Sequence, residues 1–321
     1  MEILLTGASG FVGSLLLPRL VSEGHTVRAL SRNPIRLRET LAELPTASAP
    51  AKVLAGDAIT GEGLHQALRD VEVAYYLIHS MEPTTSRSSF EERERVAAAN
   101  FAAAANTAGV RRIVYLGGLV PRWGIGDSAR RERASRHLSS RLEVERILME
   151  AVPDSIALRA SIVIGAGSRS FRLLVRLIER MPVITLPAWQ RYRTAPIDER
   201  DVIAMLAACA VSTISGEVLE VGGPDVLSYG EMLRTISESL MIGRPQLRLK
   251  VNLTPIAGRV AAAIAAESPE LVVPLMEGLQ GDLLPREDAA AERLNVHLHS
   301  FDSAVEHALA EWERVEELAA R

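Results

Sequence analysis

Cysteine is nearly absent from this sequence, and no apolar run is long. The single cysteine, Cys209, excludes an intrachain disulfide and a cysteine-rich metal site, so we expect a buried structural thiol and no bound metal. No uninterrupted apolar segment is long enough to cross a bilayer, and a strand begins where a signal sequence would stand. We therefore expect a cytoplasmic protein without a membrane partner.

Strong charge of either sign and low-complexity segments are also missing. The net charge of −4 over 321 residues gives no general attraction to nucleic acid, and we expect the arginines between residues 122 and 141 to form a solvated surface. There is no glycine- or serine-rich linker and no internal repeat. With 48% hydrophobic residues, the chain can bury a large core, in one large domain or in two of ordinary size.

Glycines gather close to the N-terminus, between a short apolar strand and an amphipathic helix. Gly7, Gly10 and Gly13 are spaced three residues apart. In such a turn the first glycine permits a sharp bend, the second lets a pyrophosphate approach the backbone, and the third lets helix and strand pack closely. The pattern predicts a dinucleotide site with the pyrophosphate at the positive end of the helix. The alternative is a glycine-rich turn that only packs.

The end of the second predicted strand lacks the carboxylate by which an NAD site usually binds the ribose hydroxyls. Ser31 and Arg32 stand there instead. A hydroxyl followed by a guanidinium suits the 2′-phosphate of NADP, because arginine can donate a forked pair of hydrogen bonds to it. We therefore predict NADP(H) as the cofactor. The alternative is that Arg32 is a solvated loop residue.

Short apolar strands alternate with longer helical patterns over the first 160 residues. This alternation predicts an α/β protein with a Rossmann-type, doubly wound parallel sheet, built from right-handed βαβ units and covered by helices on both faces. The expected strands cover residues 3–5, 26–30, 52–54, 73–78, 112–116 and 155–158, and the expected helices cover residues 11–23, 37–44, 63–68, 91–108 and 135–150.

The alternation fades after residue 160, where prolines separate shorter elements. We predict an NAD(P)-binding domain over residues 1–160 and a smaller C-terminal, substrate-side subdomain over residues 161–321. A strand at residues 218–221 could return to the main sheet. The last helices could cap a pocket or form the interface of a homodimer. Helical patterns in this half cover residues 201–211, 229–241, 269–279 and 301–320.

Several segments together resemble one superfamily. They are Thr6-Gly-Ala-Ser-Gly-Phe-Val-Gly13, Ser31-Arg-Asn33, Gly56-Asp57, Val73-Ala-Tyr-Tyr-Leu-Ile-His-Ser80, Ile113-Val-Tyr-Leu-Gly-Gly118, Leu158-Arg-Ala-Ser-Ile-Val-Ile-Gly165, Thr194-Ala-Pro-Ile-Asp-Glu-Arg-Asp201 and Glu220-Val-Gly-Gly-Pro224. With them the chain resembles the short-chain dehydrogenase/reductase superfamily, in particular its extended and atypical members, the NDP-sugar-epimerase-like and NmrA-like proteins. The cofactor-binding residues implied by the turn and by the resemblance are Gly7, Ser9, Gly10, Phe11, Val12, Gly13, Ser31, Arg32, Asp57, Ile78, His79, Ser80, Gly117 and Arg141.

Typical members carry a catalytic serine after the fifth strand and a Tyr-x-x-x-Lys motif on the next helix, and both are missing. The serine position falls at Gly117 or Gly118, the tyrosine position at His137 and the lysine position at Arg141. His137 and Arg141 are one helical turn apart and face the same side. Arg141 could bind the nicotinamide ribose and protonated His137 could be the general acid, although the charge of Arg141 disfavours that form. The alternative is two ordinary polar residues on a half-exposed helix.

Three functions fit these features. The first is an NADP(H)-dependent oxidoreductase that reduces a carbonyl or similar group on a small molecule. The second is a redox sensor or scaffold that binds NADP(H) without turnover, as the NmrA-like resemblance allows. The third, which the missing tyrosine disfavours, is an NDP-sugar epimerase or dehydratase. We favour the oxidoreductase because the loop around Gly165 and Gly167 offers polar groups to a substrate, and because Arg191 and Arg193 could bind an anionic one.

Overall fold

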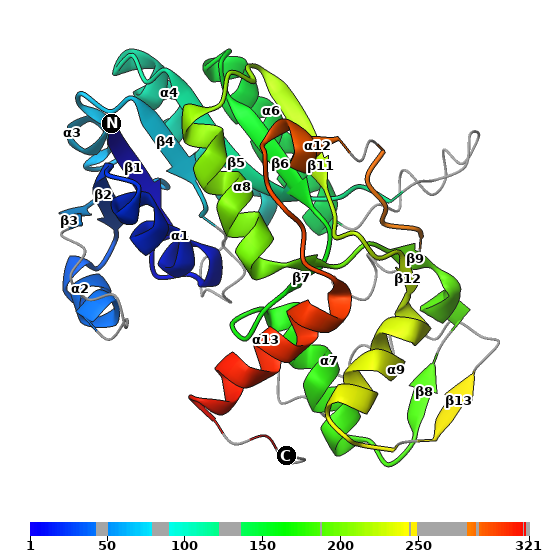
Figure 1. Cartoon of the computed structure of the whole chain (residues 1–321). Coiled ribbons are helices and arrows are strands. Elements are labelled where there is room, and N and C mark those ends of the chain that lie inside the picture. Colours follow the sequence, from blue (N-terminus) through cyan, green and yellow to red (C-terminus); the bar gives the residue numbers. More distant parts are fainter. Residues whose placement is uncertain are drawn as a thin grey trace.

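The centre of the molecule is a seven-stranded parallel sheet with the strand order β11-β6-β5-β4-β1-β2-β3 (Figure 1). The computed structural model describes residues 1–42, 51–78, 90–121, 136–186, 188–243, 245–248, 281–286, 289–316 and 318. The chain winds outward from β1 to β3 and then crosses back to β4, which is the doubly wound arrangement that the sequence predicts. The strands are β1 Glu2–Thr6, β2 Thr26–Ser31, β3 Lys52–Ala55, β4 Val73–Tyr76, β5 Arg112–Gly118, β6 Ile156–Ala160 and β11 Glu217–Val221.

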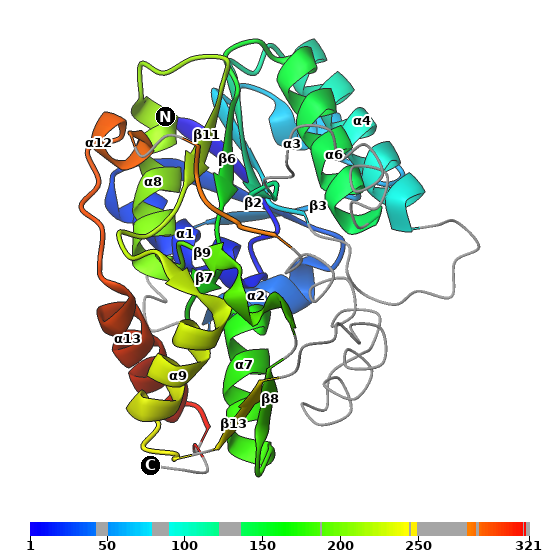
Figure 2. The ribbon, with the colours of Figure 1, turned by 90° about the vertical axis from the view of Figure 1, so that its right-hand side faces the viewer.

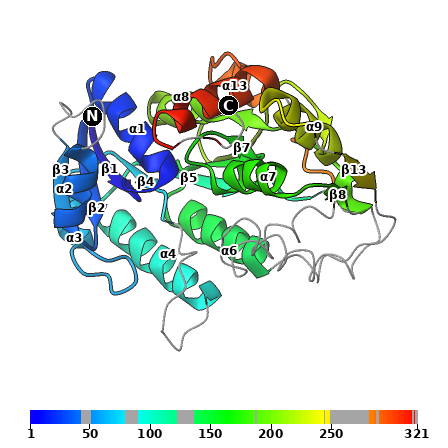
Figure 3. The ribbon, with the colours of Figure 1, turned by 90° about the horizontal axis from the view of Figure 1, so that it is seen from below.

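Helices cover both faces of this sheet, as expected (Figure 3). Neighbouring strand residues point to opposite faces, so Leu5 packs into the core on one side and Leu4 into the core on the other. Both faces are therefore apolar, as a buried parallel sheet requires. One face is covered by α1 Phe11–Ser22, α2 Pro34–Ala42 and α8 Glu199–Val211, and the other by α3 Leu64–Leu68, α4 Phe90–Thr107 and α6 Arg136–Ala151.

Several element boundaries differ from those predicted, and hydrogen bonds explain two of the differences in the first half. Helix α2 begins at Pro34, three residues before the predicted start, since Asn33 Oδ1 accepts the backbone N–H of Arg36 at 3.1 Å and proline suits the first helical position. Strand β4 ends at Tyr76 instead of residue 78. There the backbone N–H of Leu77 donates to the Thr6 hydroxyl at 3.0 Å instead of continuing the ladder.

The second half forms its own core at the carboxyl end of the sheet (Figure 2). Phe171, Ile236 and Trp312 are buried there, one from each of three helices. Its short strands pair as β7 with β10, β9 with β12, and β8 with β13. Its elements are β7 Val163–Ile164, α7 Arg169–Arg180, β8 Ile184–Leu186, η1 Ala188–Arg191, β9 Arg193–Thr194, β10 Ile197–Asp198, β12 Leu227–Ser228, α9 Tyr229–Ser239, β13 Gln246–Arg248, α12 Ala290–Arg293 and α13 Phe301–Glu313.

The strand expected at residues 218–221 is β11, and it returns to the main sheet beside β6. Helix α13 ends at Glu313, seven residues before the predicted end. Glu316 lies beyond this end and turns back, so that its carboxylate accepts hydrogen bonds from Trp312 Nε1 at 3.0 Å and from Arg172 at 3.1 Å. The helix expected at residues 269–279 lies outside the described residues.

One buried cation joins three elements at the amino end of the sheet. Arg112, 1% exposed, donates hydrogen bonds to the carbonyl groups of Cys209 (2.6 Å), Ser212 (2.8 Å) and Ile214 (2.7 Å) at the end of α8. It also contacts both carboxylate oxygens of Asp154 at 3.1 Å. Burial alone would raise the pKa of Asp154, but hydrogen bonds from Ser215 and Arg112 and the nearby arginine charges hold it below its usual value.

Replacing Arg112 should therefore destabilise the whole protein. We expect Arg112→Met to lower the free energy of unfolding in urea by about 3–5 kcal/mol, because it leaves several buried helix-end carbonyls without their donor and Asp154 with only the exposed Arg111. The matched control is Arg111→Met, since Arg111 pairs with the same carboxylate at 3.0 Å but is 46% exposed. That change should cost about 1 kcal/mol or less. Equal losses in the two variants would contradict this account.

Candidate functional site

The glycine-rich turn is a place of extreme backbone crowding. Gly7 has φ +70°, and a Cβ on it would stand 2.5 Å from the carbonyl oxygen of Leu77. A Cβ on Gly13 would stand 2.2 Å from the carbonyl oxygen of Gly7. By contrast, a Cβ on Gly10 would meet only that same oxygen, at 3.2 Å, among the described atoms. Gly7 and Gly13 thus permit close packing, while Gly10 faces open space.

That open space lies at the N-terminus of α1. Gly10 is the N-cap residue, and no side chain at this position caps the helix by a hydrogen bond. The first hydrogen bond of the helix runs from the Ser14 N–H to the Gly10 carbonyl at 2.9 Å. The helix therefore supplies no carbonyl to the N–H groups of Phe11, Val12 and Gly13. No acidic residue stands in the first turn, and Ser9 is exposed. These donors at the positive helix end fit a pyrophosphate.

Three residues predicted to contact the adenosine half of the cofactor come together at the ends of β2 and β3. Ser31 Oγ bonds the N–H and the carbonyl of Asn33, both at 3.1 Å, and so closes its own turn. Arg32, the next residue, is exposed. The Gly56 N–H donates to the Ser31 carbonyl at 3.1 Å, which brings Asp57 beside this turn. The Asp57 carboxylate accepts the N–H of Ile59 at 2.7 Å.

The nicotinamide end of the predicted site is described in part. Ile78 is half-buried against the core, whereas His79 and Ser80 lie outside the described residues. Gly117, the last residue but one of β5, has little room around it, since a Cβ on it would stand 3.2 Å from Tyr115 Cε1 and 3.8 Å from Glu145 Oε2. A Cβ on Gly118 would meet no described atom within 4 Å.

Arg141 reaches the carboxyl end of β5, beside Gly117. Its Nη2 donates to the carbonyl of Leu116 at 2.6 Å, and its guanidinium carbon lies 5.3 Å from the centre of the Tyr115 ring. The Tyr115 hydroxyl in turn donates to the Arg141 carbonyl at 3.2 Å. The backbone of His137 lies one turn earlier in α6, but its side chain is outside the described residues. The structure therefore brings Arg141 and Gly117 together.

A buried ion pair next to Gly117 was not expected from the sequence. Arg159 binds both carboxylate oxygens of Glu145, at 2.9 and 2.6 Å, and lies 3.5 Å from Glu220. The backbone N–H of Arg286 also donates to Glu220 at 2.8 Å. Two signals mark this network in the sequence: an arginine inside an otherwise apolar strand, and a glutamate one helical turn after Arg141.

The two arginines suggested for an anionic substrate are both exposed. Arg193 pairs with Asp282 at 3.3 Å, which leaves part of its guanidinium to solvent. Arg191 lies 5.4 Å from the centre of the Tyr192 ring. The loop that contains Gly165 and Gly167 packs against the ring of Phe11, so it adjoins the dinucleotide turn.

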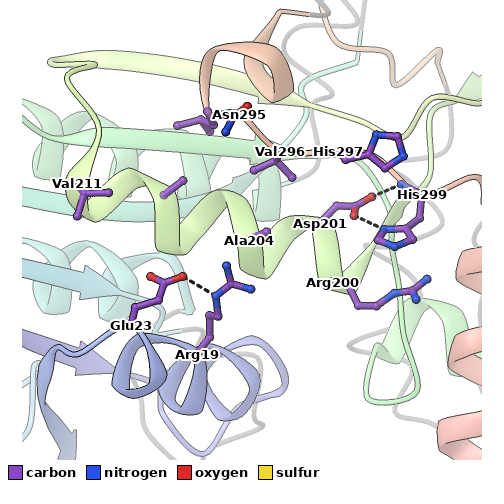
Figure 4. A pocket seen from close by; sticks show the side chains of 12 residues that line it. Arg19, Glu23, Arg200, Asp201, Ala204, Val211, Asn295, Val296, His297 and His299 are labelled. Atoms are coloured by element: carbon purple, nitrogen blue, oxygen red, sulfur yellow. Dashed lines mark hydrogen bonds and ion pairs between the residues drawn. The ribbon is translucent and has the colours of Figure 1, made fainter.

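A groove of about 500 Å³ lies along α8 and the later part of α1, lined by charged side chains (Figure 4). Its charges pair within the protein: Arg19 contacts Glu23 at 2.5 Å, and Asp201 accepts from the ring and the backbone of His299 at 2.6 and 2.9 Å. None of the predicted cofactor residues lines it.

The described ranges contain neither a metal-binding cluster nor a membrane-spanning helix. No three His, Cys, Asp or Glu residues there are arranged to hold a metal ion. No helix there combines the length and the hydropathy that a bilayer span requires.

Known proteins share both this domain and this fold. Residues 7–151 match the family model for NAD(P)H binding. Dihydroflavonol 4-reductase from Zea mays is 35% identical over 82 residues, 25% of this chain, and the match spans only 23% of that protein. The crystal structure of gox2253 covers 98% of both chains with a TM-score of 0.74 and 20% identity. UDP-glucuronic acid 4-epimerase from Bacillus cereus, solved with UDP-glucuronic acid and NAD, covers 98% of this chain and 100% of its own with a TM-score of 0.71 and 16% identity.

These likenesses agree with the glycine-rich turn and with the order of the strands. The superfamily resemblance is confirmed for the fold and for the dinucleotide-binding domain, and the cofactor is a nicotinamide dinucleotide. Residues 7–151 therefore match an NAD(P)H-binding domain, and the whole chain has the fold that these solved structures share.

Proposed function

We propose that the protein is an NADP(H)-dependent oxidoreductase that reduces a carbonyl or similar group on a small molecule. The observation that carries the proposal is the placement of Arg141. Its guanidinium lies 2.6 Å from the Leu116 carbonyl, at the same edge of the sheet as the glycine-rich turn. A cation held there, between the bound dinucleotide and the substrate-side half, suits a reaction at the nicotinamide better than passive binding does.

The choice of NADP rests on the end of β2. Arg32 is exposed beside Ser31, and the first turn of α2 adds no carboxylate that would repel a phosphate. Arg32 can donate two parallel hydrogen bonds to the 2′-phosphate, with Ser31 and the N-terminus of α2 nearby. An NAD enzyme would need an acceptor for the ribose hydroxyls at this place.

In this proposal the chain positions the substrate and supplies the proton. The bound, reduced nicotinamide supplies the hydride. The Leu116 carbonyl and the Tyr115 ring hold Arg141 in place, and its guanidinium binds the ribose hydroxyls. His137, one turn earlier on α6, donates a proton to the substrate oxygen. Related enzymes carry a serine at the position of Gly117 or Gly118, and of these two Gly118 leaves space for the substrate, since a Cβ on it would meet no described atom within 4 Å.

A second candidate is a redox sensor or scaffold that binds NADP(H) without turnover. It is favoured by one observation: a glycine (Gly117 or Gly118), His137 and Arg141 stand at the positions of the three typical catalytic residues. A third candidate is an NDP-sugar epimerase or dehydratase, which the likeness to UDP-glucuronic acid 4-epimerase suggests. Epimerisation begins by deprotonating a substrate hydroxyl, and the tyrosine that would do so is missing.

Arg32→Asp should reverse the nucleotide preference. We expect the Kd for NADPH to rise about 10- to 100-fold, because charge-assisted hydrogen bonds to the 2′-phosphate are lost and a repulsion is added, while the Kd for NADH stays equal or falls. Fluorescence titration with both nucleotides measures the ratio. Arg38→Asp, an equal charge change at an exposed position further along α2, is the control and should leave the ratio within about twofold. An unchanged ratio in Arg32→Asp would remove this residue from the site.

His137→Phe tests the proton donor. Once screening of ketones, aldehydes and sugar nucleotides for NADPH oxidation yields a substrate, we expect kcat to fall about 10²-fold or more, with the Kd for NADPH unchanged. Ser139→Ala, at an exposed position on the same helix, should have no effect. An unaltered kcat in His137→Phe would exclude this residue as the general acid and strengthen the sensor hypothesis.

A further inference from the structure

The first residue of α1 connects the dinucleotide turn to the second half of the chain. The Phe11 ring packs against the loop between β7 and α7, with its Cδ2 2.6 Å from where a Cβ on Gly167 would stand and its Cζ 2.8 Å from the same point on Gly165. No larger residue than glycine fits at either position while the ring stays there. The backbone N–H of Phe11 belongs to the anion-binding end of α1, so this ring contact supports the cofactor site directly.

A buried carboxyl group shares the contact. Glu199, the first residue of α8, is 7% exposed. Its Oε2 lies 1.9 Å from the point where a Cβ on Gly165 would stand. Glu199 and Phe11 therefore meet over the bare backbone of Gly165, so that a change at the carboxyl group reaches the dinucleotide turn through a single side chain.

The charged groups that face Glu199 come from two helices. From α8 and its N-cap these are Asp198 and Arg200, which pair with each other at 2.5 Å. From α13 they are His307, whose Nε2 lies 3.4 Å from Glu199 Oε1, and Glu311. The packing partners on the other side, Phe11 and Gly165, carry no charge. Among the described residues, Glu199 thus has two carboxylates near it, while Arg200 is paired with Asp198 and His307 is the basic side chain in contact with it.

Both partners in the Glu199–His307 contact have shifted pKa values. Burial, with the charges of Asp198 and Glu311, raises the pKa of Glu199 to about 7. Burial and the charge of Arg200 lower the pKa of His307, against the opposing effect of Asp198 and Glu311. Glu199 therefore gains or loses a proton near pH 7.

We propose that Glu199 is a positioning residue for the dinucleotide, and that its protonated form, packed on Gly165 and Phe11, is the form that binds the cofactor. A neutral carboxyl group can stay buried against Phe11 and hold the N–H groups of residues 11–13 for the pyrophosphate. A carboxylate must recruit water or a cation, which disturbs the contact, and it adds negative charge close to an anion site. Cofactor binding and proton uptake then favour each other, by an equal coupling in both directions. The inference rests on the dinucleotide site and not on reductase chemistry.

The test is calorimetric titration of the full chain with NADPH between pH 6 and pH 8, in buffers of different ionisation enthalpy. For the unaltered protein we expect the Kd to rise with pH and a fraction of a proton to be taken up on binding near pH 7. Glu199→Gln mimics the protonated carboxyl group. At pH 8 it should bind NADPH more tightly than the unaltered protein does, with a smaller difference at pH 6, and it should take up less proton. The 2′-phosphate, whose pKa is about 6, titrates equally in both proteins and cancels in their difference.

Two other variants complete the test. Glu306→Gln removes a carboxylate from the exposed face of α13 and should retain the pH dependence of the unaltered protein. Phe11→Ala should weaken binding throughout and abolish the difference between pH 6 and pH 8, because it removes the contact through which Glu199 acts. Equal proton uptake by Glu199→Gln and the unaltered protein would overturn the proposal, as would a full pH dependence in Phe11→Ala. If the unaltered protein gave these binding results but reduced no substrate, that outcome would count against the proposed function and not against the role of Glu199.

Discussion

The carbonyl oxygen of Gly7 is a closely packed point of the fold, and the position of the cofactor site depends on it. It accepts the N–H of Gly10 at 2.9 Å, and a Cβ on Gly13 would stand 2.2 Å from it. On the other side, Gly7 presses against the carbonyl of Leu77 as the chain leaves β4. This close approach draws the N-terminus of α1 onto the carboxyl edge of the sheet. Every other candidate site residue is placed relative to that helix end.

The two edges of the sheet use buried charge in different ways. At the amino edge, Arg112 is fully bonded to helix-end carbonyls and to Asp154, and all of its donors serve the fold. At the carboxyl edge, Arg141 donates a hydrogen bond to the carbonyl of Leu116, and Arg159 contacts both Glu145 and Glu220. Chemistry in a doubly wound sheet is expected at the carboxyl edge. Arg141 lies at that edge, with its guanidinium on the carbonyl of Leu116.

Much of the fold could be predicted from the sequence because its signals are local. Apolar strands and amphipathic helices of the first half are set by periodicity, and so they were placed to within a few residues. The end of β4, the start of α2 and the end of α13 differ from the prediction. Hydrogen bonds to Thr6, Asn33 and Glu316, respectively, decide these three boundaries. The strands of the second half are short, and their partners lie far away in the sequence. Periodicity does not predict such pairings.

The candidate site shows the same division. The turn and Arg141 follow from motifs, whereas the Glu145–Arg159 pair and the buried Glu199 depend on partners that the sequence does not bring together. Glu199 looks like an ordinary helix-start carboxylate, since acidic residues favour that position. Only its burial against Gly165 and Phe11 gives it another character. The domain boundary at residue 160 and the roles of His137, His79 and Ser80 stay predictions.

Hydride transfer is the central claim, and label transfer tests it most directly. The purified protein would be loaded with NADPH deuterated at C4 on either face, mixed with a metabolite extract, and the products examined by mass spectrometry. The account predicts one labelled small molecule, labelled from one face only, which would also identify the substrate. Tight NADPH binding with no labelled product, across extracts from several growth conditions, would contradict it.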